Sequence, residues 1–193
     1  MHPRRRRGSD LEDALYAATL AELVEVGYGK LSMEGIATRA HTGKAALYRR
    51  FSGKHDLVLA ALRDALPELP VLDTARTARE NLRAVLRTLC DVLTRPTPFP
   101  YITIVGELVR EPEFRAMFTQ DIVAPRLRVI ESILRHGVAT GELTPDTITP
   151  STGKTGPALV MQTVLLTGDP PTRAEIETII DTMLHRPRER FTS

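Results

Sequence analysis

Basic residues gather in one short stretch near the start of the chain, and their chemistry suits a nucleic acid. Residues 30–54 carry six Lys or Arg and only one acid, Glu34. The preceding residues 8–25 carry five acids and no base, so the positive charge is local. Ammonium and guanidinium groups bind phosphate oxygens, and an arginine can also read guanine through two hydrogen bonds. The alternative is an ordinary solvated charged surface, because charge alone does not distinguish the two.

Short helices separated by glycine and polar turns must position these basic groups. Between Pro3 and Pro67 the chain has no proline, and Ser9 and Ser32 are suited to cap helices. The pattern predicts helices over residues 9–27, 33–40, 44–51 and 54–66. The second and third are joined by a turn at residues 41–43, which is the spacing of a helix-turn-helix.

The third expected helix separates an apolar face from a small, basic one. Leu47 and Phe51 share a face and are expected to pack on the two preceding helices. Ala45 and Arg49 point the opposite way, with Tyr48 on the flank. A short helix with such an outer face fits a DNA major groove, which is about 12 Å wide.

Residues 31–57 closely resemble the DNA-binding domain of the TetR (tetracycline-repressor-like) family. The resemblance rests on Ile36-Ala37, on Leu47-Tyr48-x-x-Phe51 and on the lysine that opens the fourth helix, Lys54. It covers roughly residues 9–62. The turn His41-Thr42-Gly43 departs from the family pattern, as does Gly35, so the bases that are read are expected to differ.

The resemblance implies an all-α fold, in which an N-terminal three-helix helix-turn-helix domain is joined by a fourth helix to a helical ligand-binding and dimerisation domain. The expected boundaries are a flexible basic arm (1–8), the DNA-binding domain with its linking helix (9–66) and the effector-binding and dimerisation domain (67–193). The implied function is a homodimeric repressor that a small lipophilic ligand releases from a palindromic DNA operator through movement of the fourth helix. The alternatives are an activator or a regulator that responds to a protein partner.

The helical wheel and the resemblance together predict the DNA contacts. Arg49 is the expected base reader, whereas Tyr48 and Lys54 match family positions that hold phosphates. The full predicted set is Ser32, Thr42, Lys44, Ala45, Tyr48, Arg49 and Lys54. The arm Arg4 to Arg7 could enter the adjacent minor groove or serve only as a solubilising tail.

The rest of the chain resembles the family's second domain in layout rather than in motif. The expected helices cover residues 81–95, 101–110, 113–140 with a kink or division at Pro125, 158–166 and 172–185. The predicted ligand-binding set, mostly apolar, is Leu86, Cys90, Phe99, Tyr101, Ile104, Val105, Phe114, Met117, Phe118 and Met161, with Glu107, Arg110 and Asp121 as the few ionisable neighbours. The predicted dimer interface on the last two helices is Ala158, Leu159, Leu165, Leu166, Ile176, Ile180 and Met183. The alternative for these apolar residues is the core of the single chain.

Composition limits the remaining classes of function. The chain of 193 residues has one cysteine, Cys90, which excludes an intramolecular disulfide and a multi-cysteine zinc site. Its basic start is followed by acids rather than by an apolar segment, and no apolar run is long enough to span a membrane, so a cytoplasmic protein is expected. Residues 151–155 imitate the end of a phosphate-binding loop, but Ile148 replaces its first glycine and no strand precedes it. No cofactor, metal or catalytic residue is expected, and a helical enzyme is the alternative from a different class.

Overall fold

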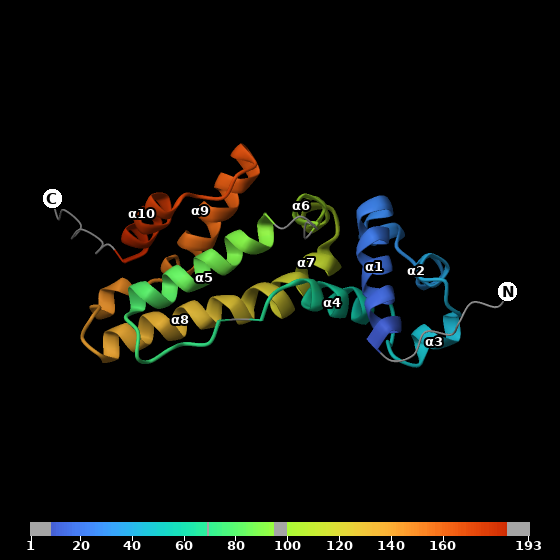
Figure 1. Ribbon diagram of the computed structural model, residues 1–193, viewed down its shortest axis with the longest axis horizontal. Coiled ribbons are helices and arrows are strands. Elements are labelled where there is room, and N and C mark those ends of the chain that lie inside the picture. The colour runs from blue at the N-terminus through green and yellow to red at the C-terminus, as the bar shows by residue number, and fades with distance from the viewer. Residues whose placement is uncertain (1–8, 69, 95–99, 185–193) are drawn as a thin grey trace. The chain divides into compact units, whose positions relative to one another are not determined.

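The computed structural model describes residues 9–68, 70–94 and 100–184, and in this part every regular element is helical (Figure 1). The all-α prediction is therefore confirmed. The basic arm Arg4 to Arg7, Phe99 and the expected helix ends at Arg95 and His185 lie outside the described residues. The chain forms two compact units: residues 1–67 with 100–122, and residues 68–99 with 123–193.

The first unit contains the predicted helix-turn-helix. Its helices are α1 (Ser9–Lys30), α2 (Met33–Arg39), α3 (Lys44–Tyr48), α4 (Lys54–Ala65), α6 (Tyr101–Arg110) and α7 (Pro112–Phe118). α1 packs on α2 and α4, and α2 packs on α3. The side chains that are fully buried there include Leu15, Leu23, Ile36, Leu47, Leu57 and Leu62.

In the first unit, α1 and α3 each end three residues away from the expected position. α1 was expected to stop at Gly27, and there the helical backbone does break, with φ 77° and ψ 164°. A last helical turn follows and runs to Lys30, because Leu31 N donates to Gly27 O at 3.0 Å. α3 ends at Tyr48 rather than Phe51, although Phe51 is still buried.

Residues 100–122, which the sequence assigned to the C-terminal domain, pack in the first unit. α6 contacts α1, and α7 contacts α4. The expected long helix from residue 113 to about 140 is divided, as anticipated near Pro125. α7 gives way to a π-helical turn, Thr119–Val123, and α8 (Ala124–Ala139) begins after it. Proline lacks an N–H group and is tolerated in a first turn, which is where Pro112 and Pro125 lie.

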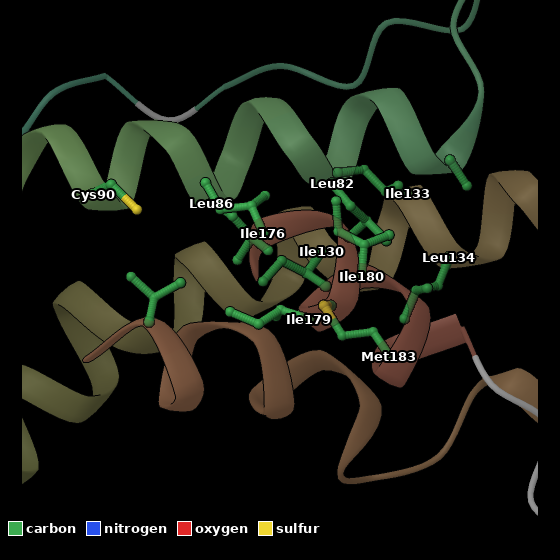
Figure 2. Packing of buried hydrophobic residues seen from close by; sticks show 12 residues of the cluster. Leu82, Leu86, Cys90, Ile130, Ile133, Leu134, Ile176, Ile179, Ile180 and Met183 are labelled. Carbon is green, nitrogen blue, oxygen red and sulfur yellow. The ribbon is translucent and has the colours of Figure 1, made fainter. Parts of the chain in front are cut away.

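The second unit consists of α5 (Ala78–Leu93), α8, α9 (Thr152–Thr167) and α10 (Arg173–Leu184), with a 3₁₀ turn at Pro145–Thr147. Its interior is one apolar cluster to which all four helices contribute. Figure 2 shows Leu82, Leu86 and Cys90 of α5 pointing toward Ile176, Ile180 and Met183 of α10, with Ile130, Ile133 and Leu134 of α8 beside them.

α9 begins earlier than expected. Thr149 Oγ1 accepts from Thr152 N at 3.2 Å, and Thr152 Oγ1 donates to Thr147 O at 2.7 Å, so threonines organise the helix start. The predicted start at Ala158 was wrong, because Pro157 is accommodated inside the helix. Residues 152–155 therefore belong to the first turn of α9 and not to a phosphate-binding loop.

Two arginines of α5 form salt bridges with carboxylates of α10. Arg83 pairs with both oxygens of Glu177, its Nη2 lying 2.9 Å from Oε2. Arg79 donates to Glu177 at 3.3 Å and to Asp181 at 2.5 Å. The hydrogen bond from Arg83 is the main cause that lowers the pKa of Glu177 to about 2.

Glu177→Gln is expected to lower the free energy of unfolding at pH 7 by up to about 1 kcal/mol, because the pair is partly solvent-screened. Because the pKa of Glu177 is lower in the folded than in the unfolded protein, its ionised form stabilises the fold at pH values above the unfolded-state pKa near 4.5. This contribution disappears as the pH falls toward 2. Urea unfolding at several pH values should show wild type and variant converging below pH 3.

The matched control is Glu131→Gln, whose carboxylate pairs within α8, with Arg135. It should change stability less at pH 7. A difference between wild type and Glu177→Gln that stays constant from pH 7 to pH 2.5 would contradict the assigned role of Glu177.

Candidate DNA-binding site

α2 and α3 form a helix-turn-helix whose turn is held by backbone hydrogen bonds. Ser32 Oγ caps α2 by accepting from Gly35 N at 3.0 Å. Thr42 N donates to Ala37 O at 3.0 Å, and Ala46 N donates to Gly43 O at 2.9 Å. His41 adopts a left-handed conformation with φ 52°, so the departure from the family turn is accommodated with some backbone strain.

The outer face of α3 is small, polar and solvent-exposed. Leu47 is fully buried, whereas Ala45 and Arg49 are exposed, as the helical wheel predicts. Tyr48 has an exposed fraction of 55%. Of the other predicted contacts, Lys44 is exposed and Thr42 and Ser32 are half-buried. Six of the seven predicted DNA-contacting residues therefore lie on or beside one short segment, residues 32–49.

Most basic groups of residues 32–50 are already paired with acids. Lys44 binds Glu34 of α2, and Arg39 binds both Glu22 and Glu25 of α1. Arg50 lies 3.9 Å from Glu12 and donates to Ala46 O at 3.4 Å.

Arg49 stands apart from these paired residues. The described part of the chain offers it no acidic partner, so its guanidinium is available to a ligand. This difference between Arg49 and its neighbours does not follow from spacing along α3, because it depends on where the acids of α1 and α2 lie.

The seventh predicted contact, Lys54, is half-buried and contacts Tyr28 of the same chain. Its Nζ donates to the backbone oxygen of Tyr28 at 3.1 Å and lies 4.5 Å from the centroid of the Tyr28 ring. Tyr28 itself has an exposed fraction of 1%. Burial, followed by the charges of Glu113 and Glu111, raises the pKa of Tyr28 to about 12.

One residue beside this site was not assigned there from the sequence. Glu107 of α6 was expected near a ligand, but its Oε2 accepts from Tyr28 N at 2.7 Å. Only the Gly27-Tyr28-Gly29 pattern at the end of α1 indicates such a close approach, since glycines admit a neighbouring side chain.

The residues predicted to bind a ligand fall in both compact units. Leu86 and Cys90 belong to the apolar cluster of the second unit, and Met161 is half-buried on α9. In the first unit Phe114 is fully buried, 4.9 Å from Tyr28 between ring centroids, and stacks on Phe118 at 6.0 Å. The others in that unit are buried or half-buried: Tyr101, Ile104, Val105 and Met117.

The predicted dimer residues divide into an internal and an exposed group. Ile176, Ile180 and Met183 are buried in the second unit's own core, which is the alternative expected for them. The other residues lie on α9, where Leu159 is half-buried and the exposed ones are Ala158, Leu165 and Leu166. Leu165 and Leu166 have exposed fractions of 47% and 73%.

The described residues contain no group of three or more His, Cys, Asp or Glu side chains that could hold a metal ion. No described helix is both long and apolar enough to cross a membrane.

Comparison with known proteins agrees with this geometry. Residues 15–61 match the model of the tetR family of bacterial regulatory proteins, and residues 72–183 match the model of the tetracyclin repressor-like C-terminal domain. Together the two matches span both compact units. Proteins of this family regulate transcription, are generally not enzymes, and typically act as dimers.

Individual relatives agree with the family models. An uncharacterized HTH-type transcriptional regulator of Mycobacterium tuberculosis, Rv1556, is 26% identical over 91% of this chain and 87% of its own. A DNA-binding transcriptional repressor TetR of Mycobacteroides abscessus is 31% identical over 70% of this chain and 72% of its own.

A solved structure shares the fold. The regulator FadR of Bacillus subtilis, determined in complex with stearoyl-CoA, has a TM-score of 0.67 and 17% identity, covering 91% of this chain and 99% of that one. With the helix-turn-helix, both family models and these relatives in agreement, the chain belongs to the TetR family of DNA-binding transcriptional regulators.

Proposed function

We propose that this protein is a cytoplasmic homodimeric repressor that binds a palindromic operator and is released by a small lipophilic ligand. The observation that carries the DNA-binding part is the outer face of α3, where Arg49 is exposed without an acidic partner in the described structure. The repressor of Mycobacteroides abscessus supports the sign of regulation.

The chemistry of the predicted effector residues supports a lipophilic ligand. Phe114, Met117 and Ile104 are buried side chains without charge, and Phe118 stacks beside them. An acyl chain is one ligand of this kind, and the FadR structure contains an acyl thioester, stearoyl-CoA. An activator, or a regulator that answers to a protein partner, would use the same α3 face with a different response.

Reading of the operator is expected to centre on Arg49. A guanidinium that contacts guanine through two hydrogen bonds contributes about 1–3 kcal/mol of discrimination. Ala45 beside it is small enough to let the backbone of α3 approach the bases closely. Tyr48, which is exposed on the same helix, is expected to bind a phosphate.

Lys44 contributes less than its position suggests, because Glu34 neutralises it. The carboxylate of Glu34 also repels phosphates on the same surface. Dimer formation is expected through the exposed apolar residues of α9, since one short recognition helix reads few bases and a dyad doubles the sequence that is read.

Genomic fragments selected with the purified protein at near-physiological salt are expected to share an inverted repeat. Arg49→Ala should weaken binding to that repeat about 5- to 150-fold, the equivalent of 1–3 kcal/mol, and change binding to unrelated DNA much less. Arg135→Ala, which removes an exposed arginine of α8, is the control. Fragments without a shared motif, whose binding collapses as salt rises, would refute specific operator recognition.

Glu34→Gln is expected to raise DNA affinity by freeing Lys44. Each added phosphate contact steepens the slope of log K against log salt by about 0.9, so the variant's slope should steepen by up to that amount per protomer. Glu131→Gln removes a paired carboxylate from α8 and should leave the slope unchanged. Equal slopes for wild type and Glu34→Gln in fluorescence-anisotropy titrations would mean that Lys44 does not reach the DNA.

Leu166→Glu is expected to raise the dimer dissociation constant at least about tenfold, since a charge would be desolvated at an apolar interface. Analytical ultracentrifugation measures the constant directly. Val71→Glu is the matched control, because Val71 is also highly exposed but lies in a loop before α5. If both variants dimerise as wild type does, the exposed face of α9 is not the interface.

A further inference from the structure

The end of α1 is bent around a carboxylate that comes from another helix. At Gly27 the positive φ breaks the helical pattern, and Tyr28 N donates to Glu107 Oε2 at 2.7 Å. Glu107, on α6, has an exposed fraction of 5%. The positive φ favours glycine at position 27, and a Cβ atom there would lie 2.9 Å from Glu107 Oε1, so the carboxylate would have to shift.

Tyr28 is held on its other sides by two further helices. Lys54 is the first residue of α4, and its Nζ donates to the backbone oxygen of Tyr28. The same ammonium group lies over the Tyr28 ring. On α7, Phe114 packs against that ring. One buried residue therefore links α6 to the first turn of α4, and all of these contacts lie within the first compact unit.

A general contribution to stability does not account well for Glu107. Burying a carboxylate is costly unless hydrogen bonds and charges compensate it. The only ion pair described for Glu107 is with Arg110, at 3.9 Å, and Arg110 is highly exposed. An apolar side chain could fill the same space without that cost. What a carboxylate adds is a directed acceptor for one N–H group, which determines where Tyr28 sits.

We propose that Glu107 is a positioning residue for operator binding. By holding the N–H of Tyr28 it places the oxygen and ring that orient Lys54 at the start of α4. When Glu107 moves, Lys54 loses its support, so α6 controls a phosphate-binding group on the DNA-reading side of the molecule. This inference rests on the proposed DNA-binding function and on the sequence prediction that Lys54 holds a phosphate.

A double-mutant cycle on operator affinity tests the connection. Using the DNA fragment recovered by selection, Glu107→Ala should weaken binding about tenfold in the wild-type background. In a Lys54→Met background, where the ammonium is already absent, the same substitution should weaken binding less than about twofold. Losses that simply multiply would show that Glu107 does not act through Lys54 and would overturn the proposal.

Conservative variants separate positioning from stability. Glu107→Gln keeps an acceptor oxygen for Tyr28 N and should retain most of the affinity. Glu107→Asp keeps the charge, but its shorter side chain moves the carboxylate away from Tyr28 N, so it should behave like Glu107→Ala. If Glu107→Ala fails to fold, the cycle is measured with Glu107→Asp. Glu131→Ala is the control, because it removes an exposed carboxylate of α8 that pairs with Arg135 in the second compact unit. Affinities that instead follow the melting temperatures of the variants would contradict a positioning role.

Hydrogen exchange gives a readout that needs no DNA. The Tyr28 amide should exchange much faster in Glu107→Ala than in wild type, while amides of α2 and α3 keep their protection. Unchanged exchange at Tyr28 would overturn the proposal directly. A wild-type protein without sequence preference would instead contradict the proposed repressor function, so the two failures are distinguishable.

Discussion

Burial of Leu47 is the constraint on which the DNA-reading surface depends. α3 has only five residues, and a helix of that length has no stability of its own in water. It exists because Leu47 is fully enclosed by the neighbouring helices of the first unit, with Phe51 buried just beyond its end. Once Leu47 points inward, the helical period places Ala45 and Arg49 outward. The orientation of the recognition surface thus follows from one apolar side chain.

Electrostatic pairing then determines which outward groups are free to act. Glu22 and Glu25 hold Arg39, which fastens α2 to α1, and Glu34 holds Lys44. These pairs are exposed and each contributes little stability, but a basic side chain that is paired with an acid is less available to bind DNA. Arg49 differs from these residues because it has no acidic partner in the described structure. Specific recognition is therefore concentrated on fewer groups than the count of basic residues implies.

The first unit is also larger than its sequence motif. α6 and α7 come from the part of the chain that matches the C-terminal family model, yet they pack on α1 and α4. The contact is polar at one point, where Glu107 meets the bend of α1, and aromatic at another, where Phe114 meets Tyr28. Effector-domain sequence and DNA-binding sequence thus share one interior. A change in α6 therefore reaches α1 by direct contact, and it reaches α4 through Tyr28 of α1.

Local sequence was sufficient for much of this protein. Capping residues, glycine breaks and apolar periodicity predicted the helix-turn-helix, the inward face of Leu47 and the division of the long helix near Pro125. These features depend on interactions between residues a few positions apart, and such interactions are written in short stretches of sequence. Only the tertiary structure decided which charges are paired, that α6 and α7 join the first unit, and that Ile176, Ile180 and Met183 face their own core. It also revealed that Lys54 and Glu107 meet at Tyr28, because their partners lie 26 and 79 residues away along the chain and no local pattern encodes contacts at that separation.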